Sequence, residues 1–580
     1  MGLYSELPAN IETVDVIIAG GGTAGCIVAA GLAEADPSFS ILVIESGPNG
    51  VGNPAVDYPA FFLNNLLPTT TGTSFYKSGP SASLAGRDLV VPCGNVLGGG
   101  SAINMMMYSR AQRSDWDSWQ TPGWSANEIL PVMRKLETYH DPGSMDRHGS
   151  SGPIQDDFVP AMNQAGWPEI EDLGSLDDCN EGKRQDTASR YLHPRLEDGL
   201  HSNLHVVVES QVVRVLFDGQ RASGVLYRPK IKGAAERLIK ARKLVVISCG
   251  AFGTPTVLER SGVGNPTVLK GAGIPQIIAN VPGVGHEHDD HHLIVYPYKS
   301  SLEPEETLDG ILTGKLDPGE LIQKNHKTLG WNAQEVTCKI RPTDSDVAAL
   351  RPDFQDVWYI EFKDNPNRLL MMMALVNCFP GEPIGVPPGQ YFGVSTFTAY
   401  PFSRGHVHIT GPEASDAVDF DAGFFADGKG IDLRKHRWAY KRQREVARRM
   451  QVFRGELPSG HPAFPADSKA ACVAPDGPLE NVQDIEYSAE DDKLVDDFAR
   501  EHVSSAWHSS GTCTMAPFDQ NGVVDSSLRV YGVEGLKLAD LSIVPKSVAA
   551  NTNHTALVIG EKAASIIIEE LGLGACITSA

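Results

Sequence analysis

Closely spaced cysteine pairs are missing from this chain of 580 residues. Its nine cysteines are scattered and odd in number, and no two of them form a C-x-x-C motif. The sequence therefore predicts neither a zinc site nor a disulfide framework. Scattered single thiols are typical of a protein that is kept reduced inside a cell.

Long hydrophobic runs are also missing, and none is long enough to span a membrane. The first apolar run, residues 14–18, has the pattern of a buried strand, so we expect no signal peptide. The last residues, Ile577 to Ala580, do not form the peroxisomal tripeptide Ser-Lys-Leu. We expect an intracellular protein, cytoplasmic or peroxisomal, without an obvious C-terminal peroxisomal signal and without a membrane partner.

Positive charge is in short supply, with 49 basic against 72 acidic residues and a net charge of −23. A strongly acidic chain is repelled by nucleic acid and by anionic membranes, so both are excluded as expected partners. The length is sufficient for several domains and a large core.

One stretch combines a strand, a tight turn and a helix. After the apolar run, Gly20, Gly22 and Gly25 follow the G-x-G-x-x-G spacing, and Thr23 and Ala24 open the predicted helix. These glycines permit the turn, the approach of a pyrophosphate and the packing of helix on strand. Glu45 ends the next predicted strand, 41–45, where a carboxylate can accept both ribose hydroxyls. The spacing predicts dinucleotide binding; the alternative is an ordinary glycine-rich turn.

Other segments predict how the rest of the chain is organised. Residues 46–80, rich in Gly, Pro, Asn and Thr, predict a long surface loop that could serve as a lid. Residues 244–248 predict a later strand of the nucleotide domain, and 294–485 a substrate domain of mixed strands. A basic helix is predicted over 432–453, and its basic residues are more typical of a solvated face or of surface ion pairs than of an anion site. Met371 to Met373 fit a buried core.

Five further motifs occur in order along the chain. They are Gly94 to Asn104, Gly250 to Gly264, Val281 to Gly285 with Asp290 and His291, Pro401 to Gly405, and Leu538 to Asp540 with Pro545. Together they resemble signatures of the glucose–methanol–choline oxidoreductase family, and the resemblance covers essentially the whole chain. Within the family, the segments around Asn104, His508 and Asn551 are most similar to those of fungal alcohol (methanol) oxidases.

The resemblance implies FAD rather than NAD, and an α/β fold (α+β overall). It implies a Rossmann-like FAD-binding domain and a second, substrate-binding domain built on an antiparallel sheet. The FAD-binding domain would comprise 1–160, 201–293 and 488–580, and the substrate domain 161–200 and 294–487. The implied cofactor-binding residues are Gly20, Gly22, Thr23, Ala24, Glu45, Gly99, Ser101, Asn104, Met105, Val212, Trp507, Asp540, Asn551 and Thr552.

The family's catalytic positions fall on His508 and Asn551. A neutral histidine can take the hydroxyl proton of an alcohol, and an amide can donate to the same oxygen. His554 is the alternative partner, which the Asn-Thr-Asn pattern disfavours. His291 and His292 follow an acidic cluster that could suggest a metal site, but the resemblance implies a structural turn near the cofactor, and we expect no metal.

The implied reaction is oxidation of a primary alcohol to an aldehyde by hydride transfer to flavin N5, with O2 reoxidising the flavin to give H2O2. The alternatives are a dehydrogenase with another electron acceptor and a hydroxynitrile lyase. Met105 stands where methanol oxidases usually have an aromatic residue, so we expect alcohols longer than methanol. Cys93 is the nearest candidate for a flavin link, yet an inert buried thiol fits better, and we expect noncovalent FAD. Self-association into a homo-oligomer is a further expectation.

Overall fold

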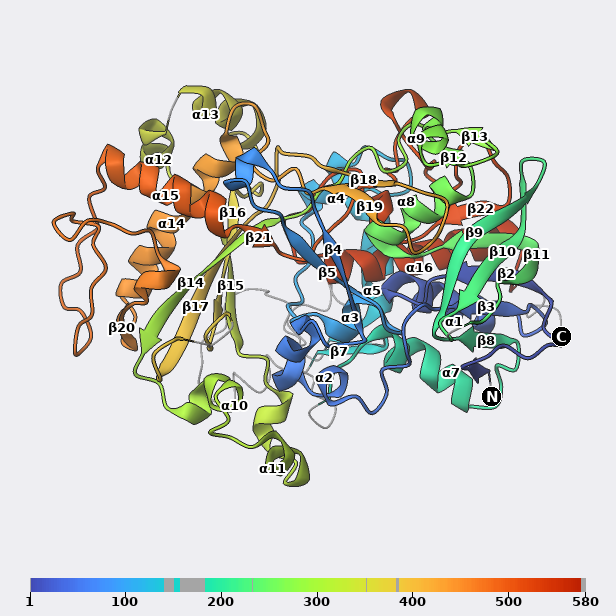
Figure 1. The fold of residues 1–580 in the computed structure, drawn as a ribbon, viewed down its shortest axis with the longest axis horizontal. Coiled ribbons are helices and arrows are strands. Elements are labelled where there is room, and N and C mark those ends of the chain that lie inside the picture. The colour runs from blue at the N-terminus through green and yellow to red at the C-terminus, as the bar shows by residue number, and fades with distance from the viewer. Residues whose placement is uncertain are drawn as a thin grey trace.

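The structure is a computed structural model that describes residues 2–139, 151–156, 183–231, 233–350, 352–381 and 385–574. Two sheets lie towards opposite ends of its long axis (Figure 1). Much of the predicted segment 161–200 lies outside the described residues.

The larger sheet begins with the strand predicted from the apolar run. β2 (Thr13–Ala19) is buried along almost its whole length and pairs in parallel with β3 on one side and β11 on the other. Buried parallel strands need apolar residues on both faces, which explains the continuous run. In spatial order the strands are β1 (Leu3–Tyr4), β8 (Leu204–Val207), β3 (Ile41–Ile44), β2, β11 (Arg237–Ile247), β10 (Arg221–Pro229) and β9 (Ser210–Asp218), with β22 (Leu536–Leu538) paired to β11.

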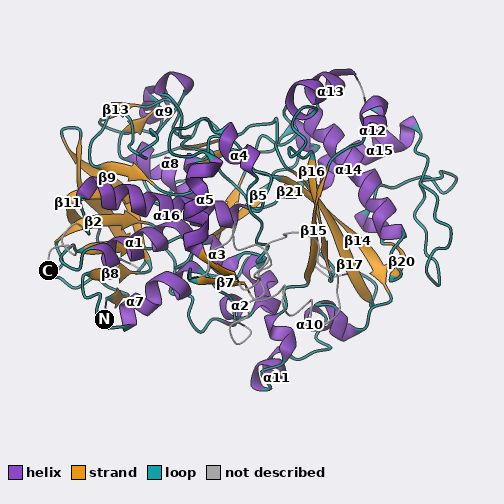
Figure 2. Cartoon of the chain, turned by 180° about the vertical axis from the view of Figure 1, so that it is seen from behind, coloured by secondary structure: helices purple, strands orange, loops and turns teal. Residues whose placement is uncertain are grey.

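Two helices far apart in sequence cover this sheet together. α1 (Thr23–Ala35) packs against α16 (Thr552–Leu571), as Figure 2 shows from behind. Gly560 of α16 permits the contact, because a Cβ there would lie 3.0 Å from the backbone of Ala24. The C-terminal segment therefore returns to the first strand–turn–helix unit of the chain.

The smaller sheet is antiparallel. Its spatial order is β15 (Gln334–Ile340), β16 (Met371–Val376), β17 (Gln390–Thr398), β14 (His292–Ser300) and β20 (Phe453–Glu456), with β21 (Ser504–Ser505) paired to β14. α14 (Ile431–Arg448) packs on β17, and α15 (Ala489–His502) packs on α14. Met371 to Met373 are buried, as predicted. The two sheets with their helices confirm the predicted α/β fold with an antiparallel second sheet.

The remaining elements connect and flank the two sheets. The shorter strands are β4 (Thr73–Lys77), β5 (Val90–Gly94), β6 (Glu137–Tyr139), β7 (Ile154–Asp156), β12 (Val263–Gly264), β13 (Ala279–Asn280), β18 (His406–Ile409) and β19 (Val418–Asp421). The other α-helices are α2 (Pro54–Asp57), α3 (Gly100–Ile103), α4 (Arg113–Ser118), α5 (Ala126–Leu136), α7 (His193–Glu197), α8 (Gly250–Arg260), α9 (Pro266–Gly271), α10 (Asp309–Leu312), α11 (Pro318–Gln323), α12 (Asp344–Ala349) and α13 (Pro352–Val357).

Two local predictions are wrong in part. Residues 46–80 are not one loop, since they contain α2, the 3-10 helix η1 (Pro59–Leu66) and β4. Proline at the first helical position starts both short helices, a signal that the loop prediction overlooked. Basic residues of α14 do form the predicted ion pairs near the surface, such as Arg437 with Asp496 and Lys441 with Asp492, but Lys435 and Arg444 are buried. The buried carboxylate of Asp432 neutralises Lys435, and that of Glu456 neutralises Arg444.

Candidate active site

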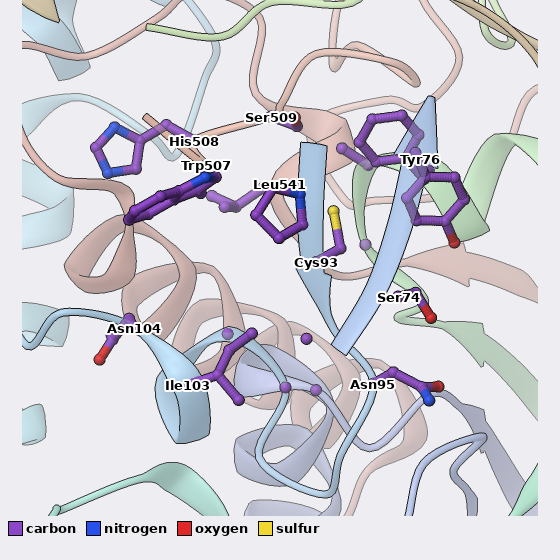
Figure 3. A pocket seen from close by; sticks show the side chains of 18 of the residues that line it. Ser74, Tyr76, Cys93, Asn95, Ile103, Asn104, Trp507, His508, Ser509 and Leu541 are labelled. Carbon is purple, nitrogen blue, oxygen red and sulfur yellow. The ribbon is translucent and has the colours of Figure 1, made fainter. Parts of the chain in front are cut away.

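A cavity of about 810 Å³ is lined by residues from both sheets and from the turns between them. Figure 3 shows His508, Trp507 and Asn104 on one side of the view and Tyr76, Ser74 and Asn95 on the other. Of the sequence-predicted site residues, Gly20 and Ser101 do not line the cavity. Those that do are Gly22, Thr23, Ala24, Glu45, Gly99, Asn104, Met105, Val212, Trp507, His508, Asp540, Asn551 and Thr552.

Two glycine turns form one wall of the cavity. Gly99 has a φ of 56°, and a Cβ there would lie 2.7 Å from the Cα of Gly22, so only glycine permits this approach. Thr23 Oγ1 donates to the carbonyl of Gly98 at 3.2 Å and accepts from the backbone N–H of Ser101 at 3.2 Å. Ser101 therefore joins the two turns from behind the cavity wall.

Two carboxylates hold the backbone on this side. Glu45 accepts the N–H groups of Gly21 at 2.7 Å and of Gly47 at 2.6 Å, while burial raises the pKa of its carboxyl. Asp540 accepts from the backbone N–H of Gly250 at 2.9 Å and from Thr254 Oγ1 at 2.5 Å. Both side chains also line the cavity, so each stabilises a turn and faces the space that a ligand would enter.

The two predicted catalytic residues meet on the other side. His508 Nε2 lies 3.5 Å from Asn551 Nδ2. Asn551 Oδ1 accepts from Ser109 Oγ at 3.0 Å, and its amide nitrogen faces the histidine. Trp507 has a φ of 61°, an uncommon conformation for a bulky residue, and it presents His508 to the cavity. Such strain is a feature of functional sites.

Asp290 fixes the backbone that carries His508. It accepts from the N–H of His508 at 3.0 Å and from Ser505 Oγ and Ser509 Oγ at 2.6 and 2.9 Å. Burial raises the pKa of Asp290 to about 7. Burial lowers the pKa of His508 to about 3, so its imidazole is neutral at physiological pH.

The resemblance placed His291 in a turn near the cofactor, but sequence reasoning did not predict its contact with His508. His291 Nδ1 lies 2.9 Å from His508 Nδ1, and His291 Nε2 lies 2.8 Å from Ser547 Oγ. No local pattern links these two histidines, which are 217 positions apart in the sequence. His554, the alternative partner, is buried in α16 outside the cavity lining and packs edge-on against Tyr108.

The described residues include no group of three or more His, Cys, Asp or Glu side chains placed to hold a metal ion. No helix among them is long and apolar enough to cross a membrane. The seven cysteines in this part of the chain are free thiols. One of them, Cys93, lines the cavity, and burial raises the pKa of its thiol, which makes it a poor nucleophile.

Several known proteins are similar to this chain in sequence and in fold. Alcohol oxidase 1 of Komagataella phaffii is 35% identical over 97% of this chain and 96% of its own length. The mitochondrial choline dehydrogenase of Homo sapiens is 30% identical over 98% of this chain and 92% of its own. An FAD-dependent oxidoreductase of Chaetomium thermophilum superimposes with a TM-score of 0.75 at 26% identity, covering 97% of this chain and 100% of that one.

Family models described as GMC oxidoreductase match residues 14–293 and 401–560. The matched segments contain both glycine turns, His508 and Asn551. They confirm the resemblance predicted from the motifs, and with it an FAD-dependent enzyme. The chain belongs to the GMC oxidoreductase family.

Proposed function

We propose that this protein oxidises a primary alcohol to an aldehyde with FAD, and that O2 receives the electrons to give H2O2. The observation that carries the proposal is the meeting of His508 Nε2 and Asn551 Nδ2, 3.5 Å apart, on a cavity that also reaches both glycine turns. A neutral base and an amide donor at one point suit a hydroxyl group that loses its proton. The relatives named alcohol oxidase support the same reaction.

The residues present fit FAD. α1 starts at Gly22 without a side-chain cap, so its first N–H groups are available to phosphate oxygens. α16 also starts without a side-chain cap, at Asn551 beside the cavity. A Cβ at Gly250 would meet nothing within 4 Å, which leaves this wall open for a ligand.

Each part of the cofactor has candidate residues. Gly22, Thr23 and Asp540 would hold the pyrophosphate and ribityl chain, Glu45 the ribose, and Val212 the adenine. Gly99, Asn104, Met105 and Thr552 would lie against the flavin ring. When bound, FAD supplies the acceptor for the substrate hydride.

The chain itself supplies proton transfer and orientation. His508 Nε2 accepts the hydroxyl proton of the alcohol, because burial keeps its imidazole neutral. Asn551 Nδ2 donates to the same oxygen as negative charge develops there. Asp290 holds the backbone N–H of His508, so the ring is already oriented when the substrate arrives.

A dehydrogenase is the second candidate, since the human choline dehydrogenase is a relative over nearly the full length. Purified enzyme in air, with a panel of primary alcohols, should release one H2O2 per aldehyde. Aldehyde formed only with an added quinone would support the dehydrogenase instead. Cleavage of a cyanohydrin, with no oxidation of any alcohol, would support the lyase and contradict the proposal.

We further propose the domain division given by the sequence, with the FAD-binding parts 1–160, 201–293 and 488–580 around a substrate domain of 161–200 and 294–487. An intracellular location, cytoplasmic or peroxisomal, and self-association also remain predictions. Cell fractionation would test the location, and analytical ultracentrifugation would test self-association.

A further inference from the structure

One face of the antiparallel sheet forms a wall of the cavity, and strand pairing arranges its residues in rows. In the first row Leu293 lies opposite Phe397, and in the second row Val295 lies opposite Ser395. The ring of Phe397 lies 6.1 Å from that of His508, so the first row starts at the predicted base. The cavity residues on this wall are Leu293, Val295, Ala374, Val376, Ser395 and Phe397.

Small side chains make a recess in the second row. Ser395 pairs with Ala374 of β16, and both line the cavity. Ser395 Oγ donates to the carbonyl of Ala374 at 3.2 Å, so its hydroxyl hydrogen is already used within the sheet. At about 3.3 Å per residue, the recess lies roughly 7 Å along β17 from Phe397. A substrate held at His508 reaches it only with a body that extends past the phenyl ring.

Bulkier side chains close the far end of the recess. Gly393 lies on the same face of β17 as Phe397, four residues away, and pairs with Val376. A Cβ at Gly393 would lie 3.1 Å from Cγ1 of Val295, 3.1 Å from Cγ1 of Val376 and 3.3 Å from Cγ of Pro380. These three side chains line the cavity and meet over Gly393. The wall therefore suits a compact body better than a long chain.

Charge is distributed unevenly around the cavity. In the described part of the chain, the charged residues of the lining are Glu45, Lys77, Lys230, Arg260, Asp416 and Asp540. None of them lies on β14, β15, β16 or β17, whose polar lining residues, Gln334 and Ser395, are neutral. Burial lowers the pKa of His508, and no carboxylate offsets this effect. A charged group on this wall would lose its hydration without gaining a counter-ion.

We propose that Ala374 and Ser395 determine specificity, and that the preferred substrate is a primary alcohol with a compact, uncharged, apolar body such as a branched alkyl or phenyl group. The hydroxymethyl group meets His508 and Asn551, and the body fills the recess. This inference rests on the proposed alcohol oxidation and names the substrate class for that site.

Two alcohols of the same shape test the requirement for an uncharged body. Choline and 3,3-dimethylbutan-1-ol differ only in the central atom of the bulky group, which is a quaternary nitrogen or a carbon. In wild-type holoenzyme, kcat/KM for 3,3-dimethylbutan-1-ol should exceed that for choline by roughly tenfold or more, because choline would bury its charge without a counter-ion. Equal values, or a preference for choline, would overturn the inference.

The same alcohol tests the recess when it is compared with ethanol, which lacks the bulky group. In the wild type, kcat/KM for 3,3-dimethylbutan-1-ol should exceed that for ethanol by roughly tenfold or more, because the recess buries the added methyl groups. A preference for ethanol would overturn the inference.

Two variants and a control locate the recess. Ala374→Val and Ser395→Val fill it from neighbouring strands, and each should lower the ratio of kcat/KM for 3,3-dimethylbutan-1-ol and ethanol by roughly tenfold. Leu375→Phe adds bulk to the opposite face of β16, outside the cavity lining, and should keep the wild-type ratio.

The outcomes separate the inference from the proposed function. If the alcohols are oxidised but Ala374→Val and Ser395→Val keep the wild-type ratio, the inference alone fails. If no alcohol, ethanol included, yields aldehyde with the wild type, the proposed function fails, and the inference fails with it. Should one of the two variants not fold, the other decides; should neither fold, the comparison with choline, which needs no variant, decides alone.

Discussion

The Nδ1 atoms of His508 and His291 lie 2.9 Å apart, and the two ring planes are nearly perpendicular at 87°. Only one of these nitrogens carries the shared proton when both rings are neutral. For His508 Nε2 to act as the base, His508 Nδ1 must donate and His291 Nδ1 must accept. His291 then carries its proton on Nε2 and donates to Ser547 Oγ at 2.8 Å. We therefore predict that His291 is a positioning residue that fixes the tautomer of His508.

His291→Ala should lower kcat by roughly tenfold or more, less than the 10²–10⁴-fold expected for loss of the base itself. KM and FAD content should change little, because His291 does not line the cavity. His291→Gln should recover part of kcat, since its side-chain oxygen can accept from Nδ1–H. Wild-type kcat in His291→Ala, measured by aldehyde formation, would show that the tautomer needs no such support.

The pH profile should reflect the burial of His508. The base acts in its neutral form, above its pKa, and burial lowers that pKa from 6.5 to about 3. As pH falls from about 8, kcat/KM should therefore stay level through 6.5 and decrease only at much lower pH, in enzyme that regains activity when returned to neutrality.

Asp290→Asn is the control for this profile, because burial raises the pKa of Asp290 to about 7. A decrease in kcat/KM near neutral pH that disappears in Asp290→Asn would be due to the titration of Asp290. A decrease centred near 6.5 in both proteins would contradict the lowered pKa of His508.

Glu45→Arg should strongly reduce FAD content. The change removes the acceptor for the N–H groups of Gly21 and Gly47 and places a donor of opposite charge at the ribose position. Absorbance of the purified protein measures bound flavin, and Glu209→Arg, on an exposed carboxylate outside the cavity, should bind FAD normally. Equal amounts of bound flavin in both variants would show that Glu45 does not contact the cofactor.

The flavin of the wild type should be bound noncovalently. Acid precipitation should therefore release the yellow colour into solution, whereas a coloured pellet would reveal a covalent link.

Met105→Phe should shift preference towards the smallest alcohols. Met105 lines the cavity, and its unbranched side chain can move aside where a phenyl ring cannot. A methylene in an apolar pocket is worth about 1–3 kcal/mol, so the ratio of kcat/KM for butanol and methanol should fall by a graded factor. The wild type should prefer longer alcohols to methanol. An unchanged ratio in Met105→Phe would refute this role of Met105.

Local spacing explains what the sequence could predict. Gly20, Gly22 and Glu45 follow from a strand–turn–helix rule that acts within a few tens of residues, and the structure has β2, α1 and β3 where that rule puts them. His508 and Asn551 are 43 positions apart and were assigned to one site because their segments resemble the family, not because of any periodicity in the sequence.

Contacts that depend on tertiary packing could not be predicted in the same way. His291, the neighbour of His508, is 217 positions away in the sequence, so no local pattern reveals their contact. The burial of Arg444 in α14 depends on the carboxylate of Glu456 in β20, which the charge pattern of the helix does not reveal. Lys435 pairs with Asp432 on the same helix, so the pair is visible in the sequence but its burial is not.

Anaerobic mixing of the holoenzyme with a primary alcohol tests the central claim most directly, because it isolates flavin reduction by substrate from the reaction with oxygen. The account predicts that the yellow colour bleaches, that air restores it with one H2O2 per aldehyde, and that His508→Ala bleaches roughly 10²–10⁴ times more slowly with its FAD still bound. His554→Ala should bleach at the wild-type rate per folded molecule. A flavin that stays oxidised with every alcohol, or that bleaches at the wild-type rate in His508→Ala, would contradict it.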